Sequence, residues 1–227
     1  MNTLLPAPRR DLLVVIVMLA ALLAGGIACA SPAGVPDAAF EPAFKHFIAA
    51  SSGDTAEIDP AADQFDALLK TDPANPVLMA YAGASTAMRA RTTMLPWKKM
   101  HYAEDGLALI DKALTLSAPA PAPAHDAPLQ HGTPGSLEAR FVAANAFLAV
   151  PPFMNRGARG AKLLADVLAS PLFAQAPLAF RGTVWMRAAA LATQEQRSAD
   201  AQRFLNEVIS RQAPQADQAR ALLKGAA

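Results

Sequence analysis

The sequence predicts an all-α fold in which antiparallel helical hairpins stack as a solenoid behind an N-terminal signal segment. Apolar residues recur at helical spacing, as at Phe40, Phe44, Phe47 and Ile48, which places them on one face of a helix. No stretch rich in Val, Ile, Thr or Tyr alternates apolar and polar residues as a half-buried strand does. Prolines separate the helical stretches, so we expect helices of moderate length joined by turns.

Residues 1–30 have the order of an export signal. Arg9 and Arg10 precede the apolar run Leu12–Leu23, and a tract of small residues follows. This is the arrangement of a secretory signal peptide, with Ala28-Cys29-Ala30 as a candidate cleavage site. The segment also resembles a lipobox, in which Cys29 would be lipidated. An uncleaved transmembrane anchor is the alternative, since Leu12 to Ala30 is 19 residues long and about 20 are needed to span a bilayer.

The charge pattern divides the rest of the chain. The formal net charge is only +1, but residues 31–72 contain eight acidic residues against two lysines, and residues 73–165 contain nine bases against five acids. Such asymmetry marks either a partner surface or two parts that dock on each other. We expect an acidic segment with a capping helix over 31–58, a helical repeat domain over 59–214, and a short helix with a tail over 215–227.

The first predicted helices are delimited by proline. Ala39–Ala50 carries the apolar stripe described above and is the capping helix. Pro60 opens the next helix, with Asp59 as its cap, and Asp72-Pro73 ends it. Pro76–Arg89 is rich in small residues that allow a neighbouring helix to approach closely, and Trp97–Leu116 has its apolar residues at helical spacing.

Residues 117–135 form a linker rich in Pro and Ala within the repeat domain, where an extended chain without a core of its own is expected. Helical spacing resumes beyond it. Turn-forming prolines or a candidate cap bound the remaining predicted helices, which are Leu137–Val150, Gly160–Ala169, Leu178–Gln194, Ser198–Arg211 and Asp217–Lys224.

The recurring pattern resembles the tetratricopeptide repeat. Ala61-x3-Phe65 followed by Leu68 and Asp72-Pro73-x-Asn75-Pro76 is similar to the second helix and hinge of that family, and Trp185-x2-Ala188-Ala189 begins a later copy. The resemblance covers about residues 61–214. It implies a stack of hairpins that shield one another and a protein-interaction scaffold without intrinsic catalysis. The chain departs from the family at Ala90–Met100, an insertion where the family has a tight turn.

Two connections between helices combine bases with aromatic residues. No acid occurs from Pro73 to Ala103 or from Ala139 to Ala165, and in a regular stack both connections lie on one edge. We therefore hypothesise a partner-binding edge for an acidic peptide, an anionic lipid headgroup or another polyanion. Its residues are Arg89, Arg91, Trp97, Lys98, Lys99, Tyr102, Phe153, Arg156 and Arg159. In the competing interpretation Trp97 and Phe153 fill the core, while the cations are solvated or pair with the acidic segment Asp54–Asp72.

Motifs for catalysis or for cofactors are not found in the sequence. No HExxH, cysteine pair, nucleophile elbow or phosphate-binding glycine loop is present. We expect no enzyme activity, no cofactor, no metal and no nucleic acid. The predicted function is that of an exported adaptor in the periplasm or cell envelope, with a protein partner there and with contact to the membrane only through Cys29 or an uncleaved N-terminal helix. The alternative is a carrier that encloses a small apolar or anionic ligand.

Overall fold

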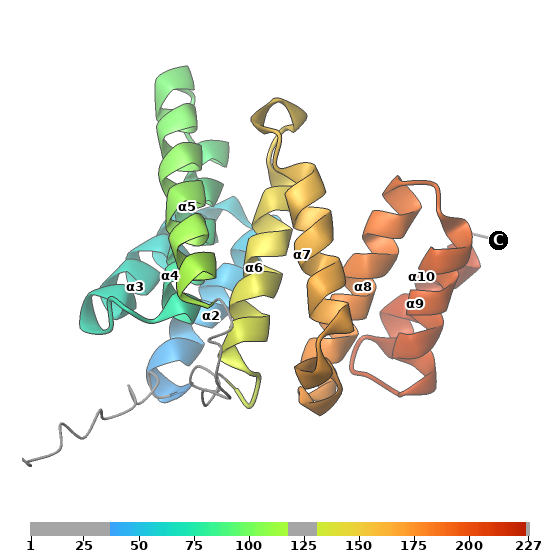
Figure 1. The fold of residues 1–227 in the computed structure, drawn as a ribbon. Coiled ribbons are helices and arrows are strands. Elements are labelled where there is room, and N and C mark those ends of the chain that lie inside the picture. Colours follow the sequence, from blue (N-terminus) through green and yellow to red (C-terminus); the bar gives the residue numbers. More distant parts are fainter. Residues whose placement is uncertain (1–36, 118–130, 226–227) are drawn as a thin grey trace, which may run out of the picture. The chain divides into compact units, whose positions relative to one another are not determined.

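The structure, a computed structural model, describes residues 37–117 and 131–225 of the chain (Figure 1). The predicted signal segment with Cys29, most of the predicted linker over 117–135, and the last two residues lie outside these ranges. The described residues belong to one compact unit.

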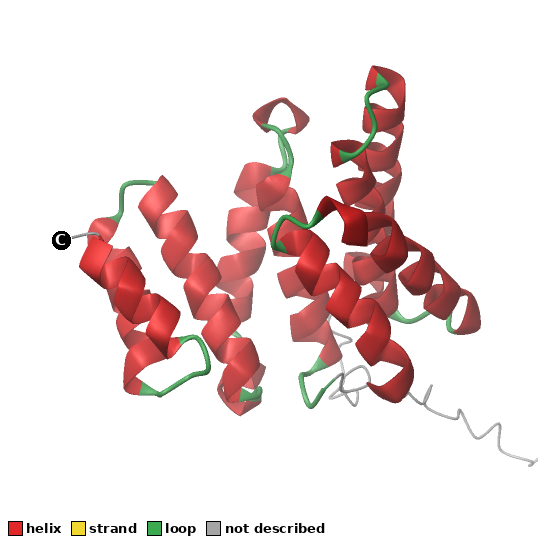
Figure 2. Ribbon diagram, turned by 180° about the vertical axis from the view of Figure 1, so that it is seen from behind, coloured by secondary structure: helices red, strands yellow, loops and turns green. Residues whose placement is uncertain are grey.

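Every regular element in these two ranges is a helix (Figure 2), so the all-α prediction is confirmed. The α-helices are α2 (Asp37–Ser51), α3 (Ile58–Thr71), α4 (Pro76–Met88), α5 (Pro96–Leu116), α6 (Gly135–Ala149), α7 (Gly157–Ala169), α8 (Leu178–Gln194), α9 (Ser198–Ser210) and α10 (Ala216–Gly225). Short 3₁₀ turns are η1 (Thr55–Glu57), η2 (Arg89–Arg91), η3 (Pro152–Met154) and η4 (Pro171–Gln175).

Helices that follow one another in the chain pack side by side. α2 contacts α3, α4 contacts α5, α6 contacts α7, and α8 contacts α9, with α10 against α9 (Figures 1 and 2). The contacts between α3 and α4, between α4 and α6, and between α7 and α8 join these pairs to one another.

Several helix starts differ from the prediction: α2, α3 and α6 each begin two residues earlier, and α7 begins at Gly157 rather than Gly160. Asn75 caps α4, because its side-chain oxygen accepts hydrogen bonds from the backbone N–H of Val77 and Leu78 at 3.0 and 3.2 Å. The predicted start of α3 at Pro60 is wrong. The helix begins at Ile58, directly after η1, and Asp59 lies inside it rather than capping it. Its carboxylate instead forms an ion pair with Arg89.

α4 is the most buried helix of the first part of the fold. Residues 76–85 are all buried, because α3, α5 and α6 surround them. Tyr81 lies among aromatic rings of α2 and α3, with its centroid 4.8 Å from those of Phe47 and Phe65. Gly83 and Gly106 bring α4 and α5 together. A Cβ atom built on Gly83 would lie 2.6 Å from the carbonyl oxygen of Gly106. The small residues predicted to allow close approach therefore do so here.

α6 is shared between two hydrophobic clusters. Its residues Val142 and Phe147 pack with α2, α3, α4 and α5 in the first cluster. Leu137 and Phe141 pack with α7, α8 and α9 in the second. Trp185 of α8 is buried in the second cluster. Because α6 joins the two clusters, it is buried on two faces and has no single apolar stripe.

Candidate partner-binding surface

The nine residues predicted to form a binding edge do not form one surface. Arg89 is turned toward α3. Arg91, Trp97, Lys98 and Lys99 lie around the start of α5, with Tyr102 half-buried further along the same helix. Phe153, Arg156 and Arg159 lie on η3 and at the start of α7. Each group has different neighbours and therefore a different role.

Arg89 holds α4 against α3. Its guanidinium donates to the carboxylates of Asp59 and Asp63 at 2.8 and 2.6 Å. Burial alone would lower the pKa of Arg89, but these two hydrogen bonds raise that pKa above its ordinary value. The contacts of Arg89 therefore match the competing interpretation, in which the cations pair with the acidic segment. This residue is not available to a partner.

The two aromatic residues of the edge are not in the core. Trp97 and Phe153 are each 67% exposed, so the interpretation in which they fill the core is wrong. Isolated exposed apolar residues are common on protein surfaces, but a gathered set marks an interaction site. Met94, Leu95 and Met100 are exposed as well, and they lie in the connection before α5 and in its first turns.

The start of α5 forms what we call the α5 tip, which consists of Met94, Leu95, Trp97, Lys98 and Lys99. Figures 1 and 2 show the first turns of α5 projecting beyond the neighbouring helices. All five side chains are exposed. Among the described residues, neither Lys98 nor Lys99 has an ion-pair partner. The tip is thus an apolar end with unpaired cations directly behind it.

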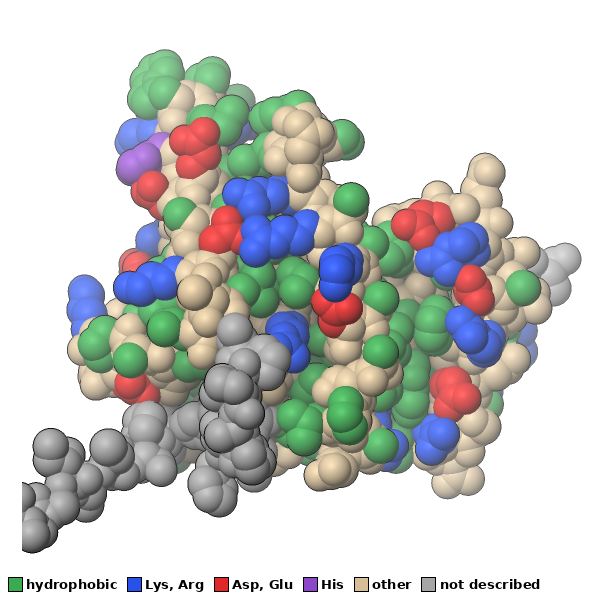
Figure 3. Space-filling view, viewed as in Figure 1, with side chains coloured by type: hydrophobic (Ala, Val, Ile, Leu, Met, Phe, Trp, Pro, Cys, Tyr) green, Lys and Arg blue, Asp and Glu red, His purple; other side chains and the backbone are tan. Residues whose placement is uncertain are grey.

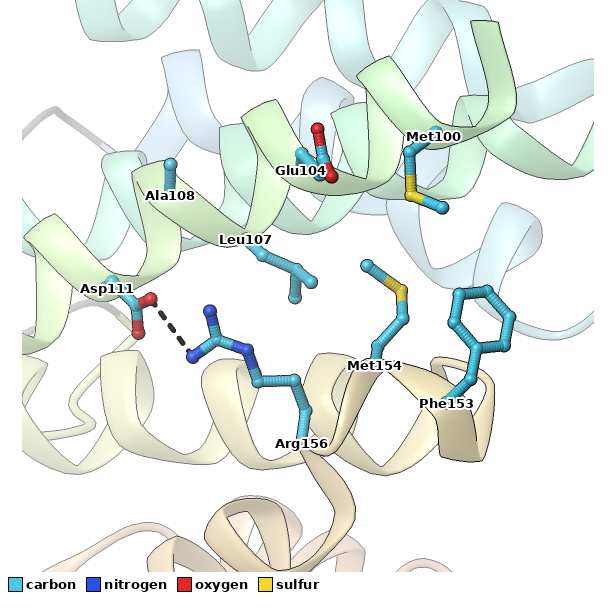
Figure 4. A pocket seen from close by; sticks show the side chains of 8 residues that line it. All are labelled: Met100, Glu104, Leu107, Ala108, Asp111, Phe153, Met154 and Arg156. Atoms are coloured by element: carbon cyan, nitrogen blue, oxygen red, sulfur yellow. Dashed lines mark ion pairs between the residues drawn. The ribbon is translucent and has the colours of Figure 1, made fainter. Parts of the chain in front are cut away.

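A groove lies between α5 and the connection from α6 to α7. We call it the methionine groove, and Figure 4 shows Met100, Met154 and Phe153 converging on it. Its volume is about 380 Å³, and it is partly open to solvent. Its lining consists of Met100, Glu104, Leu107, Ala108 and Asp111 of α5 with Phe153, Met154 and Arg156. Of the nine residues predicted for the edge, only Phe153 and Arg156 line this groove, and its other wall is the face of α5.

One carboxylate holds the far wall of the groove in place. Asp111 of α5 pairs with Arg156 at 3.2 Å and also with Arg159. Both guanidinium groups lie over the ring of Phe147, at 5.4 and 4.9 Å from its centroid. Arg156 and Arg159 thus share one carboxylate within the fold, and they position α7 against α5. They do not form a free basic edge.

Sequence reasoning missed Met100, Glu104 and Met154. A spacing signal for the α5 side of the groove exists, because Met100, Glu104, Leu107 and Asp111 recur at intervals of three and four residues and share one helix face. The position of Met154 against that face depends on how α6 and α7 pack, which no local pattern reveals. Glu104 makes no ion pair within residues 37–117 and 131–225, so its charge is available at the groove rim.

A buried carboxyl group lies outside this surface. Glu138 of α6 accepts a hydrogen bond from the hydroxyl of Tyr81 at 2.8 Å. Burial raises the pKa of Glu138 to about 8, with the charge of Asp37 adding to the rise and the Tyr81 hydrogen bond opposing it. Its second oxygen, Oε2, is buried and has no hydrogen-bond partner among the described residues. Glu138 is therefore neutral at pH 7 and ties α6 to α4 as an uncharged donor–acceptor pair.

Three further findings concern function. No group of three or more His, Cys, Asp or Glu side chains in the described ranges is arranged to hold a metal ion. No helix within those ranges is both long and apolar enough to cross a bilayer. Comparison of the chain with protein-family models, with curated proteins and with solved structures finds no match.

Proposed function

We propose that the chain is an exported adaptor of the bacterial periplasm or cell envelope, and that it binds a segment of a partner protein in the methionine groove. The observation that carries this proposal is the convergence of Met100, Met154 and Phe153 on a groove that is open to solvent. Methionine side chains adapt to differently shaped apolar groups and recur at surfaces that bind peptides.

The architecture supports the same role. We interpret the successive packed helix pairs as a solenoid similar to tetratricopeptide repeats, with α2 at one end and α10 at the other. In such a stack each pair contacts mainly its neighbours, and connections and faces are left free for partners. The export signal predicted over residues 1–30 supports a location beyond the inner membrane. A partly open groove supports an adaptor over a carrier, because a carrier encloses most of its ligand.

The chemistry of the lining defines the partner segment. Met100, Leu107 and Met154 accept one large apolar side chain, and a volume of about 380 Å³ suits such a side chain together with its backbone. Glu104 stands at the rim without an ion-pair partner in the described part of the chain. Asp111 is already paired with two arginines. We therefore expect a segment with an apolar anchor next to a lysine or arginine.

A displayed peptide library tests this proposal directly. The immobilised full chain should enrich peptides that carry Leu, Met or Phe beside a basic residue. Phe153→Ser should lower this enrichment about tenfold, because the bound peptide loses its apolar contact with the phenyl ring. Glu104→Lys should shift the preference from basic to acidic flanking residues, since it reverses the sign of the rim charge.

Leu222→Ser is the matched control for loss of an exposed apolar residue. Leu222 is half exposed on α10 and lies outside the groove, so its replacement should leave peptide enrichment unchanged. Unchanged flanking preference in Glu104→Lys would contradict the groove assignment. Mass spectrometry of the purified chain adds a separate outcome. Stoichiometric co-purification of a small apolar molecule would contradict the adaptor and favour the carrier.

A further inference from the structure

The α5 tip has features that the adaptor proposal does not use. Met94 is 87% exposed and Trp97 is 67% exposed, and neither residue lines the methionine groove. Met94 lies in the connection before α5 and Trp97 in its first turn, at the convex end of the helix that projects beyond its neighbours (Figures 1 and 2). A convex end with protruding apolar side chains cannot enclose a ligand, but it can insert into the interfacial region of a lipid bilayer. Figure 3 shows hydrophobic side chains gathered at this end of the molecule.

Charge along α5 changes with distance from the tip. The apolar residues come first, Lys98 and Lys99 follow, and the first acids are Glu104 and Asp105. At about 1.5 Å of rise per residue, Glu104 lies about 10 Å along the helix axis from Trp97. The Asp105 carboxylate lies 3.1 Å from Nε2 of His101. On α3, which packs against α4, Asp59 and Asp63 are engaged by Arg89. Negative charge is thus kept away from the tip.

From this order we infer that the α5 tip docks on an anionic phospholipid surface. Met94, Leu95 and Trp97 enter the interfacial region of the bilayer, and Lys98 and Lys99 pair with lipid phosphates just outside it. Tryptophan is enriched at this depth because its ring is apolar with one polar N–H group. Lysines close to an anionic leaflet add electrostatic attraction that salt screens. Arg91, exposed at η2 before the tip, donates a hydrogen bond to the carbonyl oxygen of Ala50 in α2 at 3.4 Å.

The geometry favours lipid over a protein at this position. The apolar residues come first along the chain and the two lysines directly after them, which matches the order of acyl region and phosphate layer in an anionic bilayer. The inference does not depend on the groove, because no residue of the tip lines it. An adaptor that docks in this way presents its groove close to the membrane surface.

Quenching of tryptophan fluorescence by brominated phospholipids tests the inference on the full chain. The chain has two tryptophans, and Trp185 is buried, so lipid bromine reaches only Trp97. With vesicles of phosphatidylcholine and phosphatidylglycerol, wild type should be quenched, and Trp97→Phe should lose that quenching. A further apolar variant, Met94→Ser, should lower vesicle partitioning severalfold. Its control is Leu116→Ser, since Leu116 is about half exposed at the opposite end of α5.

Lys98→Gln with Lys99→Gln tests the charge. Each lysine near an anionic leaflet is worth about fivefold in partitioning, so the pair should account for about 25-fold. Quenching should fall in parallel, and high salt should have the same effect on wild type. Lys112→Gln is the matched control, because Lys112 is exposed on the same helix far from the tip. Its quenching should remain at the wild-type level.

Several results would overturn the inference. One is vesicle binding without quenching of Trp97, which indicates that another part of the chain, such as the N-terminal apolar run, makes the contact. Another is an equal loss in Lys112→Gln and in the Lys98 and Lys99 variant. A third concerns the variants at Met94 and Trp97. If they change the oligomeric state but not vesicle partitioning, the tip contacts a second copy of the chain rather than lipid. Peptide enrichment by the groove is unaffected by all of these variants, so failure here leaves the adaptor proposal separately testable.

Discussion

At the scale of single residues, Glu138 is the most unusual feature of the core. A carboxyl group in an apolar interior is stable only in its neutral form unless a cation pairs with it. The hydroxyl of Tyr81 is the one hydrogen-bond partner it has among the described residues. The sequence marks Glu138 only as a lone acid in an apolar helix. Its burial follows from the packing of both faces of α6 and could not be read from local spacing.

Because of Glu138, the free energy of unfolding should decrease as the pH rises. The unfolded chain releases this proton near the ordinary pKa of 4.5, whereas the native state keeps it until a pKa of about 8. Between these values the native state binds more protons, so the free energy of unfolding falls by up to about 1.4 kcal/mol per pH unit. Below pH 4.5 this contribution is constant.

Glu138→Gln isolates the effect, because the amide still accepts the Tyr81 hydrogen bond but does not titrate. Denaturant unfolding from pH 5 to 9 should show the stability of Glu138→Gln rising relative to wild type as the pH increases. Glu104→Gln, at an exposed position, should show no such trend. Parallel pH profiles for wild type and Glu138→Gln would mean that Glu138 is ionised at pH 7.

At the scale of elements, the pairing of α4 with α5 depends on two glycines. A Cβ atom on Gly106 would clash with the carbonyl oxygen of Gly83 and lie 2.6 Å from the backbone nitrogen of Ala87. These are backbone atoms, which cannot move aside as the end of a flexible side chain can. The helix axes are therefore as close as the backbone allows, and every larger residue at Gly106 must push them apart.

Gly106→Ala should lower the free energy of unfolding by about 1–3 kcal/mol, the usual cost of overpacking, although alanine is the better helix former. Gly157→Ala is the matched control. A Cβ atom there meets nothing within 4 Å, so this variant should be neutral or more stable by up to about 1 kcal/mol. Thermal or denaturant unfolding measures both. Equal stabilities of the two variants would contradict the close approach of α4 and α5.

Most helices could be predicted from the sequence, because proline and helical spacing act locally. Leu178–Gln194 matches α8 at both ends, and Pro76–Arg89 differs from α4 by one residue. The start of α3 was missed because a 3₁₀ turn capped by Asp54 precedes it, and such a turn leaves little trace in the spacing of apolar residues.

The candidate site could be predicted only in part. Repeat position points to the connection that holds Phe153 and Arg156, but the sequence leaves open whether Trp97 is exposed or fills the core. The pairing of Arg156 and Arg159 with Asp111 depends on the packing of α7 on α5.

At the scale of the whole described unit, two hydrophobic clusters share one helix. α2 to α5 fill most of the first cluster and α7 to α10 most of the second, while α6 and Leu163 of α7 contribute to both. Where each pair of helices contacts mainly its neighbours, a loss of packing at one end weakens the distant end less than the near one. The two-sided packing of α6 and the pairing of Asp111 with Arg156 and Arg159 are the routes by which one half stabilises the other.

Phe65→Ala should reveal this difference. Phe65 is fully buried in the first cluster, and its truncation should cost about 3–5 kcal/mol. Native-state hydrogen exchange should show that protection of α2 to α5 falls by most of this amount, while protection of α8 and α9 falls by less. A uniform loss across all helices would show instead that both clusters unfold as a single cooperative unit.

Sharing of α6 also has a mechanical consequence. Under tension applied between the chain ends, load reaches each cluster through its outermost helix, and α6 is drawn from both sides at once. Unfolding of either cluster frees one face of α6 but leaves the opposite face packed in the cluster that is still folded. Extension should therefore proceed in at least two steps, with the intermediate holding α6 in whichever half resists longer.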